Sequence, residues 1–295
     1  MLDAIRGLTT AIATAGIVAV IAGYFGDRHP ALDTLGAFRL HALVAFGALF
    51  AFALVFRAMT ARFIALTGAM LAAAGLAPAV LPADPIGPPE LTLFSQNLRF
   101  DNPTPQAVVA GVEAARADIV AFQEVSRPNR AILDALRYPT QVLCEFAGVG
   151  DVALLSRHPM IGSPGCARGQ GVAWARLSTP AGEVTAVTLH LPWPWPHTQA
   201  AQSERVAGIL AELEEPVVIA GDFNIPAWGA SLKRIAESTG TRAVPGLRLT
   251  FLRPAFWPGL PLDHVLVSEE LLAETRMIDA FGSDHAALLT GLRFR

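Results

Sequence analysis

The sequence predicts an α/β protein in which three transmembrane helices precede a globular domain. Three observations support this fold class. The first third of the chain is nearly free of charge, and the whole chain of 295 residues is 53% hydrophobic and only 16% charged, whereas about 25% is typical of soluble domains. Three long uncharged runs lie in that third. Strand-length apolar runs and helical patterns then alternate as far as the C-terminus.

The distribution of charge divides the chain near residue 90. Residues 1–89 hold five Arg and four Asp, which leaves 17 of the 22 basic residues and 21 of the 25 acidic residues to the remainder. The second part therefore has the composition of an ordinary globular domain with a net charge of about −4. Its length is sufficient for a sizeable core.

The uncharged runs predict transmembrane helices near 8–25, 40–56 and 63–81. The runs are 20, 17 and 21 residues long, and about 20 apolar residues span a bilayer. Three runs in 80 residues exclude a signal peptide, which has one shorter run, and disfavour buried core helices. The middle run is the weakest, and if it lies only in the interface the topology inverts. Because these runs hold no Asp, Glu or Lys, we expect residues 1–81 to form an anchor rather than a transport path.

Arginine residues predict the orientation of this anchor. Arg6, Arg57 and Arg62 lie on one side of the three predicted helices, and Arg28 and Arg39 lie on the other. The side richer in Arg is usually cytoplasmic. We therefore expect a multi-pass membrane protein whose C-terminal domain is extracytoplasmic, which means periplasmic if the cell is bacterial.

The C-terminal domain is expected to cover residues 90–295, after a Pro/Gly linker at 82–89 with the sequence PADPIGPP. Apolar runs, many of them β-branched or alternating, predict strands at 91–98, 118–122, 151–155, 171–177, 184–191, 216–220, 263–267 and 286–293. Helical patterns occur at 104–116, 129–137, 198–214 and 229–238. Because the two kinds of element alternate, the domain is α/β or α+β.

The two cysteines allow two interpretations. Cys144 and Cys166 could pair if the domain lies in an oxidising compartment, or they could be two free buried thiols. Their spacing is not that of a CxxC motif, so we do not expect them to bind a metal.

Polar side chains gather where the predicted strands end or begin. They are Asn97, Glu124, His190, Asp222, Asn224, Asp263, His264, Asp284 and His285. One carboxylate in such a place is usually a turn residue or a helix cap. A sheet that brings carboxylates, amides and imidazoles to one edge predicts a pocket on rigid supports.

The residue types indicate metal-assisted chemistry on a phosphate ester. Glu124 and Asp284 offer hard oxygen ligands suited to Mg²⁺ or Mn²⁺, and the histidines lack the HExxH spacing of many zinc sites. Asparagine amides can donate hydrogen bonds to an anionic oxygen, and imidazoles can donate to phosphate or move a proton near neutral pH. Asp222 can accept a proton from water. This combination fits hydrolysis of a phosphoryl ester by electrostatic stabilisation.

Seven short strings occur together in a specific order. They are QNLRFDNP (96–103), FQEV (122–125), LLSRHP (154–159), TLHLPWP (188–194), GDFN (221–224), LDHVLVS (262–268) and SDH (283–285). In order and spacing the chain resembles the endonuclease/exonuclease/phosphatase superfamily, which includes apurinic endonucleases, deoxyribonucleases, neutral sphingomyelinases and inositol polyphosphate 5-phosphatases. The resemblance covers about residues 91–295. It implies a four-layered α/β sandwich, with two β-sheets flanked by helices and the site at one edge.

The resemblance also implies a metal site. Glu124 would be the principal ligand, with Asn97 beside it and Asp284 on the opposite side. Some members have an acidic residue two positions after the first Asn, where this chain has Arg99. Arg99 could bind the substrate phosphate or be a surface residue, and Asp101 could supply the acidic group instead.

The catalytic roles come from the same resemblance. Asp222 would orient or deprotonate the attacking water, and Asn224 would hold the scissile phosphate. His285, held in its tautomer by Asp263, would contact the phosphate or transfer a proton. His190 would bind phosphate or assist the leaving group.

Three further residues are open to interpretation. Alternation places His264 on the other face of its strand from Asp263, so we expect a structural role for it. Trp193 and Trp195 could stack on a base, enter a lipid interface, or simply pack a Pro-rich loop.

The expected function is that of a membrane-anchored phosphoric ester hydrolase that needs Mg²⁺ or Mn²⁺. We expect a nuclease-like activity (endonuclease or exonuclease), because this is the commonest activity in the superfamily that the chain resembles. The alternative is a phosphoesterase for phospholipid head groups, inositol phosphates or small phosphate esters. A net negative domain argues against tight binding of duplex DNA. Membrane lipid is an expected partner, and no protein partner is evident. A catalytically inactive binding module on the same fold is disfavoured by the presence of Glu124, Asp222, Asn224, Asp284 and His285.

Overall fold

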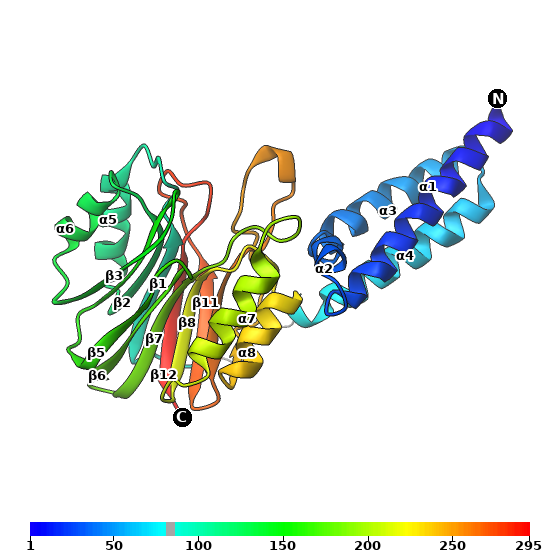
Figure 1. Cartoon of the computed structure of the whole chain (residues 1–295). Coiled ribbons are helices and arrows are strands. Elements are labelled where there is room, and N and C mark those ends of the chain that lie inside the picture. The colour runs from blue at the N-terminus through cyan, green and yellow to red at the C-terminus, as the bar shows by residue number, and fades with distance from the viewer. Residues whose placement is uncertain (81–85) are drawn as a thin grey trace.

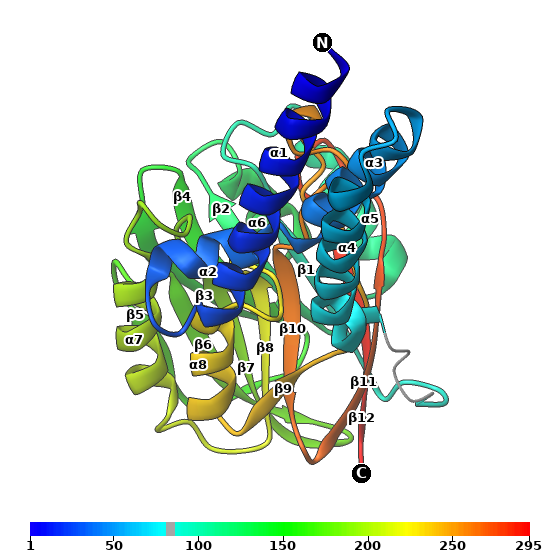
Figure 2. The ribbon, with the colours of Figure 1, turned by 90° about the vertical axis from the view of Figure 1, so that its right-hand side faces the viewer.

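The computed structural model describes residues 1–80 and 86–295, as a helical N-terminal part beside an α/β domain (Figure 1). The N-terminal part comprises α1 (Leu2–Ala22), a short 3₁₀ turn η1 (Gly23–Phe25), α2 (Pro30–Ala37), α3 (Arg39–Val55) and α4 (Met59–Val80). Figure 2 shows α1, α3 and α4 side by side as a bundle, with α2 turned away from it.

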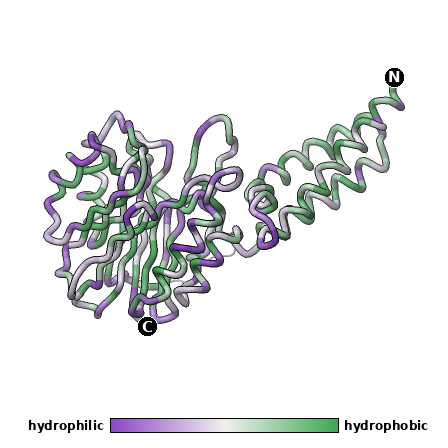
Figure 3. Tube along the Cα trace, in the orientation of Figure 1, coloured by the Kyte–Doolittle hydropathy of each residue, from purple (hydrophilic) through white to green (hydrophobic). Residues whose placement is uncertain are grey.

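Two of these helical segments, Leu2–Phe25 and Met59–Val80, are long and apolar enough to cross a membrane. The pair α2 and α3 meets at a bend of 58° and counts as a third span only if it is taken as one unit. Apolar residues cover most of the bundle (Figure 3). The three uncharged runs thus correspond to α1, α3 and α4. Residues 81–85, which include part of the predicted linker, lie outside the described residues.

Two of the helices begin earlier than we predicted. Arg6 and Arg62 lie inside α1 and α4 instead of before them. The Nε of Arg6 donates to the carbonyl of Phe56 and the Nε of Arg62 donates to that of Ala53, each at 3.1 Å. Since the last carbonyls of a helix have no partner within it, both arginines satisfy the end of α3 and are tolerated inside their own helices.

The α/β domain contains two six-stranded sheets. The first has the order β11 (Leu271–Met277), β12 (Leu288–Phe294), β1 (Leu91–Asn97), β2 (Ile119–Val125), β4 (Gly150–Ser156) and β3 (Thr140–Ala147). The second has the order β5 (Met160–Ala167), β6 (Val172–Thr179), β7 (Gly182–His190), β8 (Val217–Asp222), β10 (Asp263–Ser268) and β9 (Thr241–Ala243).

The sheets pack face to face, and helices cover both outer faces. The largest buried cluster draws its apolar side chains from both sheets. A second cluster lies under α5 (Pro105–Ala115) and α6 (Arg130–Leu136), and a third lies under α7 (Gln199–Leu210) and α8 (Ala230–Ser238). The four-layered α/β sandwich that the resemblance implied is therefore confirmed. All eight predicted strands and all four predicted helices of the domain are present.

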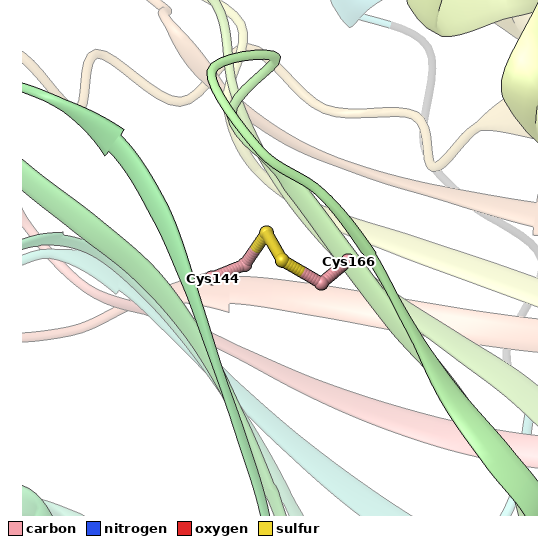
Figure 4. The surroundings of a disulfide bond; sticks show 2 residues. All are labelled: Cys144 and Cys166. Carbon is pink, nitrogen blue, oxygen red and sulfur yellow. A yellow bond between two sulfur atoms is a disulfide. The ribbon is translucent and has the colours of Figure 1, made fainter.

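A disulfide joins the two sheets along one edge of the sandwich. Cys144 on β3 and Cys166 on β5 are bonded, with their Cα atoms 5.4 Å apart (Figure 4). Both strands are edge strands, one from each sheet. The structure thus agrees with the first interpretation of the cysteines, in which they pair.

Several contacts join the helical part to the α/β domain, and two of them come from α2. The carboxylate of Asp33 accepts a hydrogen bond from the backbone N–H of Ala230, at the start of α8, and thereby satisfies one of the free amides of that helix. The indole of Trp228 donates to the carbonyl of Gly36 at 2.7 Å. These contacts hold the bundle against one end of the second sheet and its helices (Figure 2).

Candidate active site

Strand register brings the predicted polar residues together around Asp222. Asp222 is the last residue of β8, and it lies opposite His190 on β7 and opposite Asp263 on β10. Its side chain is fully buried. Its Oδ1 accepts from the backbone N–H of Asn224 at 2.8 Å, and its Oδ2 accepts from the Nδ2 of Asn97 at 2.9 Å. The amide of Asn97 therefore connects the first sheet to the second.

Asn97 also binds Glu124, on the neighbouring strand of its own sheet. The Nδ2 of Asn97 donates to one oxygen of Glu124 at 3.0 Å, and the backbone N–H of Phe100 donates to the other at 2.8 Å. Burial raises the pKa of Glu124 above its usual range, and the nearby carboxylate of Asp284 adds to this effect while the hydrogen bonds oppose it. A cation between these two carboxylates would relieve their mutual repulsion.

Three residues of the site have left-handed backbone conformations. The φ angles are +61° at Arg99, +55° at Glu124 and +50° at Asn224. Such angles are uncommon for residues other than glycine, and they cluster at functional sites. Glu124 lies within an irregularity of the β2–β4 pairing. A Cβ at the facing Gly150 would lie 2.7 Å from the carbonyl carbon of Glu124, so only glycine fits there.

His285 is held between two carboxylates. Its Nδ1 lies 2.8 Å from the Oδ2 of Asp263, and its Nε2 lies 3.8 Å from the Oδ2 of Asp222. Burial acts to lower the pKa of His285, but the charges of Asp263 and Asp222 outweigh it and raise the pKa to about 10. We therefore treat His285 as an imidazolium at neutral pH.

The second histidine, His190, is neutral instead of charged. Burial, together with the charge of His285, lowers the pKa of His190 to about 3. The 3.6 Å approach of its Nε2 to Asp222 is therefore not an ion pair. Burial raises the pKa of Asp222 to about 7, with Asp263 adding to the effect and His285 opposing it. The site thus holds a neutral imidazole, a charged one, and a carboxylate that titrates near neutrality.

Asn224 completes this group at the end of β8. Its Nδ2 donates to the carbonyl of Leu191 at 2.8 Å and, more weakly, to the Oδ2 of Asp222 at 3.3 Å. Its Oδ1 is buried and has no partner among the described residues.

The two other predicted residues form ion pairs at the mouth of the site. Asp284 accepts from the Nε of Arg253 at 2.6 Å, and Arg99 contacts both carboxylate oxygens of Asp101, at 2.6 and 3.2 Å. Arg99, Arg253 and Asp284 all line the pocket described below. We did not predict Arg253, which lies in none of the seven strings.

A pocket of about 400 Å³ opens over these residues. It contains Glu124, His190, Asp222, Asn224, Asp284 and His285 among its lining residues. Its aromatic wall consists of Phe100, Phe146, Trp193, Phe251 and Phe256. The rings of Trp193 and Phe256 are stacked, with centroids 6.1 Å apart. Apart from Trp193, these aromatic residues were not among the residues to which we assigned a site role.

His264 lies on the opposite face from the pocket. Its Nε2 is 3.0 Å from the carbonyl of Ile225 and 3.1 Å from that of Pro261. Burial, with the charge of Arg248, lowers its pKa to about 4. Trp195 is 51% exposed and does not line the pocket, whereas Trp193 does.

The donor chemistry fits a hard divalent cation on one side of the pocket. The ligand atoms of Asp222, Asp263 and His285 lie within 4.8 Å of one another. In the structure these atoms are hydrogen-bonded to one another and to Asn97, and the Nδ1 of His285 already contacts Asp263. Glu124 and Asp284 also line the pocket, and their carboxylate oxygens are of the type that Mg²⁺ and Mn²⁺ prefer.

Comparison with known proteins gives a consistent result. A model of the endonuclease/exonuclease/phosphatase family matches residues 94–285. A UPF0294 protein of Vibrio cholerae is 32% identical over 171 residues, which cover 51% of this chain and 57% of that protein. The chain thus matches little more than half the length of this curated relative.

Solved structures share the fold at low sequence identity. The endonuclease/exonuclease/phosphatase from Bacteroides vulgatus is 18% identical, with a TM-score of 0.58 over 70% of this chain and 99% of that one. Beta toxin from Staphylococcus aureus, solved with bound magnesium ions, is 16% identical, with a TM-score of 0.54 over 68% and 99%.

Proposed function

This chain belongs to the endonuclease/exonuclease/phosphatase family, and on that premise we propose that it is a membrane-anchored, divalent-metal-dependent phosphodiesterase with a catalytic domain at residues 90–295. The observation that carries the proposal is the buried carboxylate of Asp222, which is surrounded by amide and imidazole donors at the base of one pocket. A water molecule there would face both a proton acceptor and donors for a phosphate.

We assign the attacking water to Asp222. With a pKa raised to about 7 by burial, its carboxylate is a sufficiently strong base to take a proton from water near neutral pH. The Nδ2 of Asn97 holds this carboxylate in position. A phosphate oxygen would replace the weak 3.3 Å contact between Asn224 and Asp222 and accept the amide hydrogen instead.

The two histidines act on the phosphate from the same side. The imidazolium of His285 can donate from Nε2 to a phosphate oxygen or to the leaving group, while Asp263 fixes its other nitrogen. The neutral His190 can donate a hydrogen bond from Nε2. Fixed donors in a buried site stabilise the charge that develops in the transition state.

We assign the metal to Glu124 and Asp284, with Asn97 beside them. A bound Mg²⁺ or Mn²⁺ would supply positive charge for the phosphate oxygens and neutralise the two carboxylates. The pocket that these residues line is otherwise bounded by the paired Arg99 and Arg253. In this proposal the two guanidinium groups stay positively charged within their ion pairs and can donate hydrogen bonds to the approaching phosphate.

The nuclease-type activity that the sequence resemblance implied stays a second candidate. The stacked rings of Trp193 and Phe256 favour it, because bases stack on such rings. The charge of the domain favours a smaller or lipid-borne phosphodiester instead, since Arg99 and Arg253 are both paired with acidic residues.

We place the catalytic domain outside the cytoplasm. The disulfide between Cys144 and Cys166 supports this placement, because disulfides persist in oxidising compartments. A fusion of alkaline phosphatase after Arg295 should be active, since that enzyme needs an oxidising compartment. An inactive phosphatase fusion would reverse the orientation.

The activity is tested with the full chain in detergent and bis(p-nitrophenyl) phosphate, with and without Mg²⁺. We expect hydrolysis that depends on the metal, and a loss of at least about 10²-fold in Asp222→Asn. A parallel panel of DNA, RNA, sphingomyelin, phosphatidylglycerol and inositol phosphates identifies the substrate class. Wild-type rates in Asp222→Asn would remove the assignment of the base.

A further inference from the structure

We propose that a groove between α1 and α3 holds the hydrocarbon chain of a phosphate-bearing membrane lipid and presents its polar end to the candidate active site. This inference rests on the proposed function and specifies its substrate class. The groove has a volume of about 870 Å³, which is within the usual range of small-molecule sites, about 300–1,000 Å³.

The walls of the groove are almost entirely apolar. Leu8 and Ile12 line it from α1, and Ala45 and Phe52 line it from α3. All four residues are exposed on the surface of the helical part. In water such a surface would be unfavourable. In a bilayer, which α1 is long and apolar enough to cross and which α3 could cross together with α2, it suits a lipid chain.

The floor of the groove is closed by one aromatic ring. Phe46 is buried, lines the groove, and lies between α1 and α4. A Cβ added at Gly16 would lie 3.0 Å from this ring, and one at Gly68 would lie 2.4 Å from it. Because neither glycine has a side chain, the ring of Phe46 fits between α1 and α4. The inserted ring keeps α1 and α3 apart, and this gap is the groove.

The groove ends at the buried cation of Arg39. Arg39 is only 8% exposed, and its two terminal nitrogens donate to the carbonyls of Gly75 and Gly23. Its Nε packs against Gly75 of α4, and its guanidinium lies over the ring of Tyr24. Arg39 is therefore held in the packing between α3 and α4 and closes this end of the groove. The phosphate of a bound lipid would lie beyond it, toward the catalytic pocket.

The same end of the groove adjoins the catalytic pocket. His41 lines the groove, and its Nε2 lies 3.0 Å from the carbonyl of Phe256. Phe256 in turn lines the catalytic pocket, where its ring stacks on Trp193. Phe38, another residue of the groove, packs against the cluster that contains Phe251 of the pocket. One layer of side chains thus separates the two cavities.

Exposed tryptophans lie beside this junction. Trp257 is 71% exposed and follows Phe256 in the chain, and the carbonyl of Trp195 accepts a hydrogen bond from Thr34 of α2. In Figure 1 the loop that carries Trp257 projects beside the α2 end of the bundle. Tryptophan is enriched where membrane meets water, so both cavities would open near the lipid head groups.

The test uses the full chain in phosphatidylcholine nanodiscs that contain phosphatidylglycerol with a diazirine in one acyl chain. After irradiation, cross-linked peptides are quantified by mass spectrometry against the mole fraction of probe. We expect saturable cross-links on α1 and α3 that line the groove, whereas those at the outward-facing Phe63 should rise in proportion to the probe. Proportional labelling at both places would overturn the proposal.

A matched pair of variants controls for folding. Ala45→Trp fills the groove, and Ala51→Trp adds the same ring at an exposed position of α3 outside it. Ala45→Trp should lower the saturable cross-linking at least about 5-fold, a loss typical of a blocked apolar contact, and Ala51→Trp should leave it unchanged. Equal effects of the two variants would contradict a defined site.

The phosphate is tested by competition and the catalytic link by hydrolysis. Unlabelled phosphatidylglycerol should displace the probe about 10-fold better than diacylglycerol with the same chains, the scale of one hydrogen bond to a charged group, because only its phosphate can reach the donors of the catalytic pocket. Equal competition in the wild type would overturn recognition of the phosphate. Ala45→Trp should hydrolyse bis(p-nitrophenyl) phosphate at the wild-type rate but lose hydrolysis of the lipid phosphodiester. Failure of the wild type on both compounds would overturn the proposed function and the delivery of substrate, and saturable cross-linking would then report a lipid site alone.

Discussion

The Oδ2 of Asp263 lies 2.8 Å from the Nδ1 of His285, and both side chains are buried at the base of the candidate active site. They come from different sheets, since Asp263 begins β10 and His285 precedes β12. The contact therefore fixes the imidazole relative to both layers of the sandwich. It also leaves Nε2 as the nitrogen that faces Asp222.

Replacement of Asp263 by Asn should lower kcat by about 10²- to 10⁴-fold, because an amide stabilises the imidazolium less and can select the wrong tautomer. The rate is measured with bis(p-nitrophenyl) phosphate at saturating Mg²⁺. Asp134→Asn, on the exposed face of α6, is the matched control and should keep the wild-type rate. The double variant Asp263→Asn/His285→Ala should be no slower than His285→Ala alone, because the two side chains act as one unit. Additive losses would show that Asp263 acts independently of His285.

Removal of the metal should abolish activity, and Glu124→Gln should raise the Mg²⁺ concentration for half-maximal activity at least about 10-fold. The neutral amide keeps the shape of the side chain but loses the charge that binds the cation. Binding is also measured without turnover, as the rise in melting temperature that Mg²⁺ produces. The exposed Glu145→Gln on β3 is the control. A wild-type Mg²⁺ dependence of both melting and activity in Glu124→Gln would exclude Glu124 as a ligand.

The sequence predicts the central strands but not the outer ones, and the reason is physical. The four strands that we did not predict, β3, β5, β9 and β11, are the edge strands of the two sheets. An edge strand has a neighbour on one side only and is partly exposed, so its sequence need not be continuously apolar. β5, for example, reads MIGSPGCA and contains a proline, which edge strands tolerate.

The residues of the candidate site also fall into two groups, those that the sequence predicts and those that it does not. Residues such as Asp222 and Glu124 directly end or adjoin central strands, so their position in the sequence predicts that they meet. The aromatic wall and Arg253 come from loops, where no periodicity relates a residue to its neighbours in space. Phe256, for example, reaches the pocket through a short 3₁₀ turn at Pro254–Phe256 that only the folded chain reveals.

Loss of the disulfide should destabilise the domain by about 2–4 kcal/mol, because the link between residues 22 apart in sequence restricts the unfolded chain. The measurement is the midpoint of thermal unfolding of Cys144→Ser/Cys166→Ser in detergent, compared with the wild type. Reduced wild-type protein should unfold at the same lower temperature as the variant. A variant that melts like the oxidised wild type would mean that the bond does not form or does not restrict unfolding.

The buried His264 should make the stability of the folded chain depend on pH in mildly acidic solution. Burial lowers its pKa in the folded state to about 4, from an ordinary value of 6.5. Between these values the unfolded chain binds a proton that the folded chain does not. The contribution of His264 is therefore complete above about pH 6.5 and is lost as the pH falls toward 4, at up to about 1.4 kcal/mol per pH unit.

His264→Gln removes this proton without removing the hydrogen-bond donor, since a glutamine amide can also reach the carbonyls of Ile225 and Pro261. We expect the variant to be less stable than the wild type at pH 7.5, because the shape of the side chain differs, but to lose less stability between pH 6.5 and 4.5. Urea unfolding at several pH values gives the two slopes. His197→Gln, at an exposed position, should retain the wild-type slope. Since His190 is also buried with a lowered pKa, some dependence of stability on pH must persist in His264→Gln. A pH dependence identical to that of the wild type would show that His264 already binds its proton in the folded chain, which would contradict the lowered pKa that its burial produces.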